Sequence, residues 1–241
     1  MKADLADSKP NTGKKLSITI DGQKYNRYPI KTHIISPEDN IIDVVKRYAL
    51  PHLKNTDTLI ISERVVAITQ GRMYLISDLK PSFWAKMLVK FVSRPSWGIG
   101  IGSPWTMEIA IREAGLWRIL LAGAVSALTK PFGIRGLFYR IVGHGVNAID
   151  GPTEYTLPPG NKAATLGPKD PDKVAQNLQS SIFNLQSIHV SVAIIDANDI
   201  GRRIEGASSD VDRTWACEVF RDNPLGQSRQ QTPMAIVRKL L

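Results

Sequence analysis

Two aspartates stand at the ends of apolar, strand-like runs that lie far apart in the sequence. Asp196 closes the run in VSVAIIDANDIGRR (190–203), and Asp150 closes the shorter run in GVNAIDGPTEY (145–155). Turn formation alone explains either aspartate equally well, because Asp, Asn and Gly tolerate left-handed backbone. The pair together fits a further role, because hard divalent ions prefer oxygen ligands and bridge to substrate phosphates. Asp150 and Asp196 are therefore candidate ligands of one Mg²⁺ or Mn²⁺ ion.

Other motifs for cofactor chemistry are incomplete. Gly98, Gly100 and Gly102 give GxGxG rather than the GxGxxG of a dinucleotide fold, and no acidic residue follows at the required distance. No P-loop is present, and the four histidines lack metal-ligand spacing. The single cysteine, Cys217, excludes an intramolecular disulfide and a thiolate metal cluster. A reducing compartment fits this cysteine usage, so we expect a cytoplasmic protein.

Helical and strand-like segments alternate along the chain, which predicts an α+β fold. Asp21-Gly22 predicts a tight hairpin over 15–30, and Ser103 followed by Pro104 predicts the start of a helix. Further segments are a strand and a second apolar stretch over 57–72, helices over 40–53, 82–94, 117–128 and 170–185, a Gly-rich turn region over 131–145, and strands over 188–196 and 233–240. No linker separates them, so the sequence predicts one domain over 15–241 after a disordered polar tail over 1–14.

The positive charge is concentrated in one segment. Residues 80–140 contain nine Lys and Arg side chains against two glutamates, which is seven of the nine net charges. Three interpretations remain besides a solvated basic face: nucleic-acid binding, a surface near anionic lipid, or a pocket for a phosphorylated or polycarboxylate ligand. No nucleic-acid-binding motif is visible, so nucleic acid is not expected. The longest apolar stretch (119–128) is about half a membrane span, so insertion is not expected either.

Four blocks of the sequence resemble the coenzyme F420-0:γ-glutamyl ligase family. They are ISERVVAITQGR (61–72), VNAIDGPTEYTLPPGNKAATLGPKDPDKVAQNL (146–178), VSVAIIDANDIGRRIEG (190–206) and TPMAIVR (232–238). The resemblance implies a mixed-sheet α+β fold and an intertwined homodimer. It also implies an amide-bond-forming ligase, in which GTP (or ATP) phosphorylates the carboxylate of a deazaflavin acceptor. The α-amine of glutamate then displaces phosphate.

The resemblance also assigns site residues. Asp150 and Asp196 fall on the family's metal-ligand positions, and Asp222 is the candidate for a third ligand. The segment whose main chain contacts the nucleotide corresponds to Lys31, Thr32, His33 and Ile34. Arg202 and Arg203 directly follow the Asp196 turn and are candidate phosphate contacts, the alternative for Arg202 being a surface pair with Asp199. No catalytic residue is assigned.

The departures from the family pattern are at positions that the resemblance assigns to nucleotide and metal binding. The family's nucleotide-binding lysine is Ile68 here, its following glutamate is Gln70, and its metal-binding threonine is Ala197. Gly151-Pro152-Thr153 replaces Ala-Ser-Asn, and the region after Asp196 is shorter. Two hypotheses follow: a ligase with this or another carboxylate acceptor, or a non-catalytic member that binds an anionic ligand or a protein partner.

The implied partners are small anionic substrates, glutamate and a second copy of the chain, without a membrane partner. Trp97, Trp105 and Trp117 offer more aromatic surface than one compact core requires. This surplus also favours a homodimer, because aromatic residues are enriched at interfaces.

Overall fold

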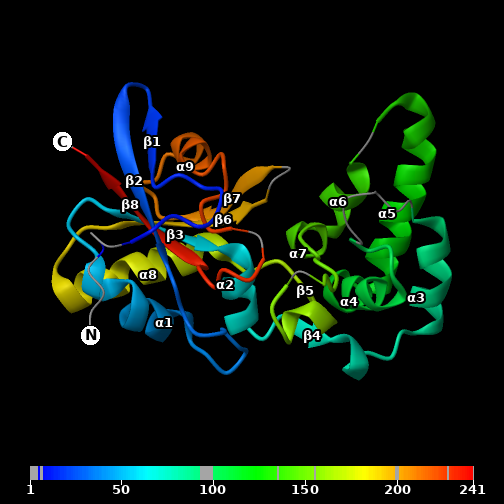
Figure 1. Cartoon of the computed structure of the whole chain (residues 1–241). Coiled ribbons are helices and arrows are strands. Elements are labelled where there is room, and N and C mark those ends of the chain that lie inside the picture. Colours follow the sequence, from blue (N-terminus) through cyan, green and yellow to red (C-terminus); the bar gives the residue numbers. More distant parts are fainter. Residues whose placement is uncertain are drawn as a thin grey trace. The chain divides into compact units, whose positions relative to one another are not determined.

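The computed structural model describes residue 5 and residues 8–92, 100–134, 136–154, 156–198, 201–226 and 228–240. The chain forms two compact units, one made of Met1–Gly71 with Asp170–Leu241 and the other of Arg72–Lys169 (Figure 1). In the predicted polar tail, the Asn11 amide donates hydrogen bonds of 2.8 Å each to the Pro224 carbonyl and the Thr232 hydroxyl. Asn11 is therefore fixed to the first unit.

A mixed sheet forms the centre of the first unit. Its described strands are six, in the order β1-β2-β8-β3-β6-β7. Their bounds are β1 Ser17–Ile20, β2 Gln23–Ile30, β3 Thr58–Ser62, β6 Ser191–Ala197, β7 Arg202–Ala207 and β8 Met234–Lys239. β3 and β6 run parallel, and the other neighbours run antiparallel. The predicted α+β class with a mixed sheet is confirmed.

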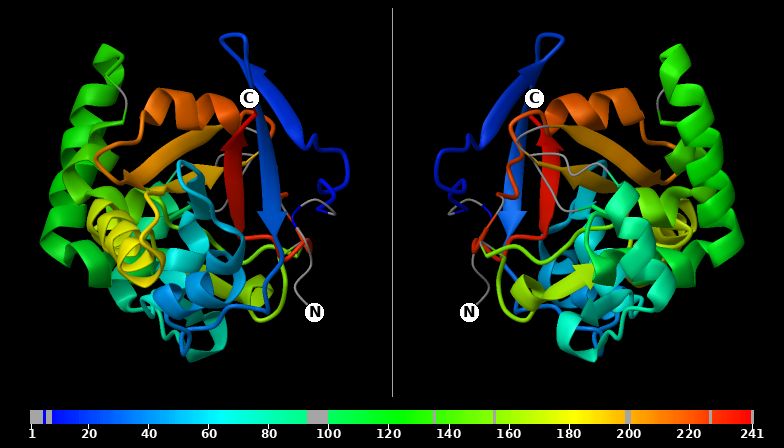
Figure 2. Two further views of the ribbon diagram at one scale, coloured as in Figure 1. Left: turned by 90° about the vertical axis from the view of Figure 1, so that its left-hand side faces the viewer. Right: turned by 90° about the vertical axis from the view of Figure 1, so that its right-hand side faces the viewer.

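Helices cover both faces of this sheet. They are α1 Ile41–Tyr48, the 3₁₀ turn η2 Leu50–His52, α2 Glu63–Thr69, α8 Pro171–Gln186 and α9 Arg213–Val219. α9 packs its buried side chains on Ala193, Ile195 and their neighbours on one face. α2 and α8 contact β6 on the other side. Both views in Figure 2 place α9 above the sheet and α1 and α8 below it.

Local sequence explains the hairpin and the helix starts. Asp21 and Gly22 adopt φ of 48° and 77°, the two positive values of a type I′ turn, so the predicted hairpin is confirmed. The Asn40 side chain accepts the Ile42 N–H at 2.8 Å and caps α1. The second apolar stretch of 57–72 is the helix α2, which ends before Gly71.

The second unit is mainly helical. It contains α3 Phe83–Leu88, α4 Pro104–Ala114, α5 Leu116–Thr129, α6 Leu137–Val142, α7 His144–Asn147, the 3₁₀ turns η3 Ile76–Asp78, η4 Val89–Phe91, η5 Lys130–Phe132 and η6 Gly160–Lys162, and the strands β4 Met73–Leu75 and β5 Ala163–Thr165. Ser103 caps α4 in a capping box with Thr106, as the sequence predicts. Gly115, at φ 83°, separates α4 from α5.

The region 131–145, predicted as Gly-rich turn, is different in the structure. It contains α6 and the start of α7. Gly136 and Gly143 have φ of 80° and 96° and bracket α6. The glycines therefore bound α6 at both ends rather than forming one continuous turn, because glycine adopts positive φ at low cost.

Within the described part of the chain, no helix combines the length and the apolar character needed to cross a membrane.

Candidate functional site

Three strands finish at the same end of the sheet in the first unit. Ile30 at the end of β2 pairs with Met234 at the start of β8, Met234 pairs with Ile61, and Ile61 pairs with Ile194. The carboxyl ends of β2, β3 and β6 therefore lie at the same end of the sheet. Neighbouring strands are about 4.8 Å apart, so the ends of β2 and β6 are roughly 14 Å apart. In α/β sheets, ligands bind outside such carboxyl ends.

The predicted nucleotide-contacting segment Lys31–Ile34 leaves the sheet at this end. The N–H of Thr32 donates to the Gln231 carbonyl at 3.0 Å, and its hydroxyl donates to the His33 carbonyl at 2.8 Å. Thr32 is buried, whereas Lys31 is exposed. The main chain is thus held in place, and the Lys31 ammonium is accessible to an anion.

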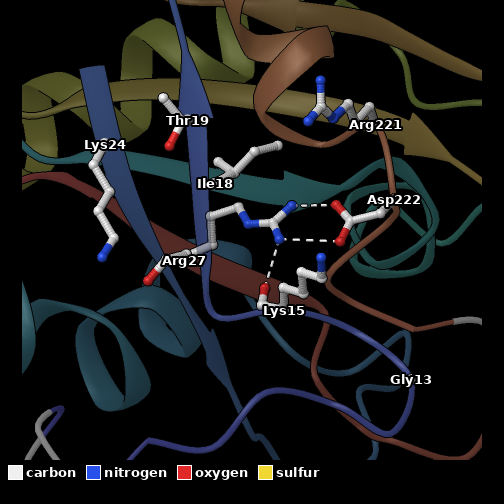
Figure 3. Close-up of a pocket in the computed structure, with 9 residues that line it drawn as sticks. Gly13, Lys15, Ile18, Thr19, Lys24, Arg27, Arg221 and Asp222 are labelled. Atoms are coloured by element: carbon white, nitrogen blue, oxygen red, sulfur yellow. Dashed lines mark hydrogen bonds and ion pairs between the residues drawn. The ribbon is translucent and has the colours of Figure 1, made fainter. Parts of the chain in front are cut away.

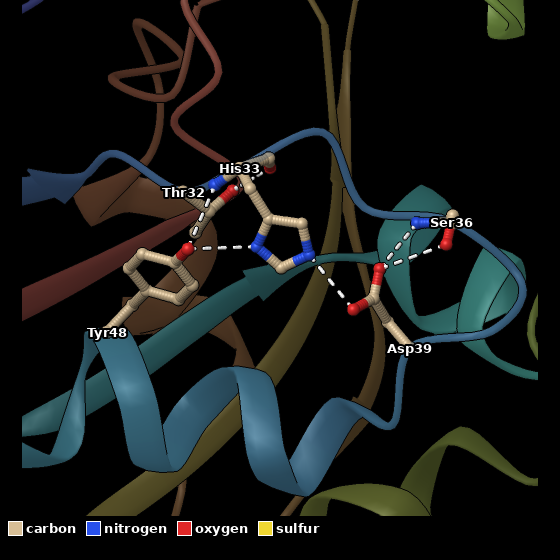
Figure 4. A network of polar contacts seen from close by, with 5 residues as sticks. All are labelled: Thr32, His33, Ser36, Asp39 and Tyr48. Carbon is tan, nitrogen blue, oxygen red and sulfur yellow. Dashed lines mark hydrogen bonds and ion pairs between the residues drawn. The ribbon is translucent and has the colours of Figure 1, made fainter.

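The His33 side chain belongs to a polar network (Figure 4). Its Nδ1 lies 2.9 Å from the Tyr48 hydroxyl and its Nε2 lies 2.9 Å from Asp39 Oδ1. Asp39 Oδ2 accepts the Ser36 N–H at 2.8 Å and the Ser36 hydroxyl at 3.2 Å. Burial raises the pKa of Asp39, but the hydrogen bonds from Ser36 and His33 outweigh it and hold this pKa below its usual value. An ionised Asp39 therefore orients the imidazole.

Asp196 lies near the carboxyl end of β6, where the sequence places it. Its position is opposite Arg203 on β7, and it is half-buried. The β6–β7 register shifts between Ile194 and Ile195, beside Asp196. Such irregularities re-aim side chains and are frequent next to active sites. The turn is closed by the Gly201 N–H, which donates to the Asn198 side chain at 2.8 Å.

Both candidate phosphate-binding arginines contact glutamates. The Arg202 guanidinium lies 2.5 Å from Glu218, and Arg203 Nε lies 2.5 Å from Glu205. The alternative pairing of Arg202 with Asp199 lies outside the described residues. A phosphate at this position would have to compete with carboxylates for the two guanidinium groups.

Asp150 belongs to the second unit and is not at the end of a strand. It follows α7 and forms a single antiparallel bridge with Thr165, with N–H···O distances of 2.9 Å in both directions. The expectation of a strand end is wrong here, because the apolar residues before Asp150 include the end of a short helix. Asp150 is exposed. Because Asp150 and Asp196 belong to different units, their joint coordination of a metal stays a prediction.

The third predicted ligand, Asp222, binds a buried arginine (Figure 3). Asp222 Oδ2 accepts from Arg27 at 3.0 Å, and Oδ1 accepts from the other nitrogen of the same guanidinium. Arg27 is only 1% exposed and also donates to the Val219 carbonyl at 2.9 Å. Burial raises the pKa of Asp222, but the hydrogen bonds and charge of Arg27 outweigh this effect, so the pKa lies below its usual value. A metal ion at Asp222 would share this carboxylate with Arg27.

An open pocket of about 530 Å³ surrounds this pair in the first unit. Lys15, Lys24 and Arg221 line it together with Arg27 and Asp222 (Figure 3). All three lysine and arginine side chains at the rim are exposed. Cations therefore outnumber the one lining carboxylate, and the pocket suits a small anion.

The described residues contain no group of three or more His, Cys, Asp or Glu side chains placed to hold a metal. Magnesium does not need such a cage, since one or two carboxylates with substrate phosphates and waters can hold it. Asp196 fits this mode as one carboxylate at the sheet end. Ala197 adds no oxygen ligand from its side chain.

Glu63 is a further candidate site residue that the sequence analysis did not name. It begins α2 directly after β3, at the same sheet end as Asp196, and is buried. The sequence does contain a signal for Glu63: the Ser-Glu pair follows the apolar run TLII (58–61), and a carboxylate directly after a strand is the pattern that singled out Asp196. Near it, Ile68 is buried in α2 where the family has its lysine.

The incomplete glycine motif of residues 98–102 precedes α4. Gly98 lies outside the described residues, as does Trp97. The Ser103 hydroxyl already accepts the Thr106 N–H at 3.1 Å. This helix start therefore fulfils a capping role in the second unit.

A protein-family model described as F420-0:Gamma-glutamyl ligase matches residues 29–212. The chain belongs to this ligase family. The match includes the whole second unit and part of the first, and it contains Lys31–Ile34, Asp150 and Asp196 but not Asp222 or β8.

Among curated relatives of this ligase family, the "Coenzyme F420:L-glutamate ligase" of Methanopyrus kandleri is 26% identical over 162 residues. The aligned part covers 67% of this chain and 55% of that relative. The chain therefore spans about half the length of the relative it matches.

Proposed function

We propose that the chain is a γ-glutamyl ligase that forms an amide bond between a carboxylate acceptor and glutamate, with GTP or ATP as the phosphate donor. Membership of the family supports the reaction class. The observation that carries the proposal for this chain is that Lys31–Ile34, Glu63 and Asp196 all lie at the same end of the sheet. The acceptor follows from the relative's name: coenzyme F420 or a similar anionic carboxylate.

The proposed reaction has two steps. An acceptor carboxylate oxygen attacks the terminal phosphorus, and the nucleoside diphosphate leaves. The amine nitrogen of glutamate then attacks the acyl carbon, phosphate leaves, and the amine loses a proton. Mg²⁺ or Mn²⁺ supplies charge neutralisation for the phosphates when it is bound.

The candidate site residues of the two units have distinct roles in this proposal. Asp196 and Asp150 are the metal ligands, with Asp222 a weaker third candidate because Arg27 binds its oxygens. The main chain of Lys31–Ile34 holds the nucleotide. The exposed Lys31 ammonium neutralises phosphate charge in place of the family's lysine, whose position is occupied by Ile68. Arg202 and Arg203 approach the phosphates by exchanging their glutamate partners.

A direct assay tests this function. The pure protein is incubated with GTP or ATP, Mn²⁺, glutamate and the deazaflavin acceptor, while phosphate release and the mass of the acceptor are followed. We expect release of phosphate together with addition of glutamyl residues. Absence of nucleotide-dependent thermal stabilisation, and of phosphate release with every carboxylate acceptor tried, would contradict the ligase.

The second candidate function is binding of an anionic ligand without catalysis. The basic pocket around Arg27 and Asp222 favours it, because Lys15, Lys24 and Arg221 present three cations to one open depression. Stabilisation by inorganic phosphate or citrate that is lost in Lys24→Ala, without metal-dependent nucleotide binding, would favour this function over the ligase.

We also propose a homodimer, from the family resemblance. Trp105 is partly exposed on α4 and is a candidate for the contact. Light scattering at micromolar concentrations should give twice the chain mass, and a monomer across that range would contradict the dimer.

A further inference from the structure

Helix α5 of the second unit presents an unbroken apolar face to its surroundings. Trp117, Leu121 and Leu128 are 81%, 59% and 71% exposed, and Ala124 between them is exposed as well. Their spacing of four, three and four residues places them on one side of the helix. The buried residues Ile119 and Ala122 lie on the other side.

The segments around α5 continue this surface. Phe132 in η5, at the end of α5, is 81% exposed, and Ile134 follows it. Helix α3 with η4 exposes a second group of aromatic side chains, Phe83, Trp84 and Phe91. Figure 1 shows α3 and α5 along the same side of this unit. We call the outward residues of α3, η4, α5 and η5 the apolar rim.

Positive charges border the apolar rim. Among the described residues of segment 80–140, six basic side chains are exposed and form no ion pair with another described residue: Lys80, Lys86, Lys90, Arg118, Lys130 and Arg140. The two glutamates of the segment are neutralised, since Glu108 accepts from Arg112 at 3.0 Å and Glu113 accepts from Arg72 at 2.7 Å. The described part of segment 80–140 is therefore basic, and the exposed carboxylate of Asp78 lies just before it in the chain.

We propose that the apolar rim is a peripheral binding surface for an anionic lipid bilayer. Trp, Phe and Leu side chains enter the boundary between head groups and acyl chains, while Lys and Arg at the border contact anionic head groups. α5 has 14 residues and is about 21 Å long, too short to span a hydrocarbon core of about 30 Å. It therefore lies in the plane of the surface. The sequence predicted no membrane partner because no segment is long enough to insert across a bilayer. Peripheral binding through the apolar rim does not require such a segment.

The charge distribution favours lipid over the other occupants. In a two-fold dimer through α5, the same patch would face itself, so the basic residues Arg118 and Lys130 would face basic residues of the second copy. A nucleic acid matches the charges but leaves the aliphatic residues Leu121 and Leu128 against phosphates. An anionic bilayer complements both the charges and the apolar side chains.

Co-sedimentation of the full chain with vesicles tests the proposal. Phosphatidylcholine vesicles are compared with vesicles that also contain phosphatidylglycerol, at low and high salt. We expect at least about tenfold more binding to the anionic vesicles and weaker binding in high salt. Leu121→Ser with Leu128→Ser should lower partitioning by more than about tenfold, and Lys130→Ala by about fivefold.

A matched control is Phe183→Ser with Leu185→Ser, which removes two exposed apolar side chains from α8 of the other unit. This control should bind vesicles like the wild type, and circular dichroism melting should show that both double variants fold. Equal vesicle binding by the two double variants would overturn the proposal, because adsorption would then follow net charge alone.

Other outcomes point to other occupants and also overturn the proposal. One is a wild-type chain that ignores anionic vesicles. Another is a Leu121→Ser, Leu128→Ser variant that changes from dimer to monomer by light scattering. A third is a rim that binds an oligonucleotide more tightly than anionic vesicles. Ligase activity is measured separately, so a failed ligase assay leaves the vesicle result unchanged.

Discussion

Asp196 and Arg203 occupy directly opposed positions on β6 and β7, one residue from the shift in strand register. Arg203 in turn binds Glu205, whose side chain is almost fully buried. A carboxylate at a strand end thus stands beside a guanidinium that a second, buried carboxylate already binds. Together these three side chains carry one net negative charge. A metal–nucleotide complex entering there brings both a cation for Asp196 and an anion for Arg203.

Asp196→Asn should abolish the proposed activity while leaving the fold intact. The amide keeps the size of the carboxylate but removes the charge that a divalent ion needs. We expect phosphate release to fall by at least about 100-fold, with an unchanged melting temperature. Asp43→Asn, on the exposed side of α1, is the control and should behave as wild type. An active Asp196→Asn enzyme would remove this residue from the site.

Arg203→Ala should destabilise the first unit, because it leaves the buried Glu205 carboxylate without this guanidinium. We expect the free energy of unfolding to fall by about 1–3 kcal/mol. Arg202→Ala breaks an ion pair of partly exposed side chains and should cost no more than about 1 kcal/mol. Urea denaturation of both variants measures the difference, and equal costs would mean that burial of Glu205 does not matter.

Gly206→Ala should be poorly tolerated. A methyl group at position 206 would overlap the backbone of Pro171 and Asp172 at the start of α8, so β7 and α8 would have to separate. We expect a loss of about 1–3 kcal/mol in the free energy of unfolding. Gly201→Ala is the matched control, since nothing lies within 4 Å of a methyl group there. Similar melting temperatures for the two variants would contradict the close approach.

The ion pair of Arg27 and Asp222 should make the free energy of unfolding depend on pH in the acidic range. The pKa of Asp222 is lower in the folded chain than its usual value, so the stabilisation is fully present above the unfolded pKa of about 4. It is lost as the pH falls through the folded pKa. Asp222→Asn leaves the buried Arg27 without its carboxylate and should lower stability by about 3 kcal/mol at neutral pH.

Denaturation of wild type and Asp222→Asn across pH measures this dependence. The gap between the two proteins should be constant above about pH 5 and shrink in stronger acid. A gap that does not change with pH would mean that the carboxyl charge is not what stabilises Arg27. The same variant separates structure from metal binding: loss of stability with unchanged Mn²⁺ affinity assigns Asp222 to the fold.

Local signals in the sequence predicted the elements with strong local determinants. The Asp21-Gly22 turn, the Ser103 cap and the α8 periodicity each depend on neighbours within a few residues, and each is present. β7 (Arg202–Ala207) was missed because its sequence is polar at one end and its pairing with β6 is what makes it a strand. Asp196 was placed correctly at a strand end for the same local reason.

Relationships across the chain escaped prediction. Arg27 and Asp222 are 195 residues apart, and nothing near Asp222 signals a buried guanidinium. The location of Glu63 and Asp196 at the same end of the sheet depends on the parallel pairing of β3 with β6. The network of His33, Asp39 and Tyr48 likewise forms only when α1 packs beside the end of β2. Such contacts depend on topology, which periodicity does not encode.

The position of β8 has a consequence for how the protein is made. This strand, Met234–Lys239, lies between β2 and β3 in the sheet, although more than 160 residues separate it from either in the chain. While the ribosome is still producing the second unit, the first has both neighbours of the missing strand but not the strand itself, and their edges are open to wrong pairing. The continuous second unit meets no such delay. Synthesis therefore completes a helical unit first and closes the sheet only when residues 234–239 emerge.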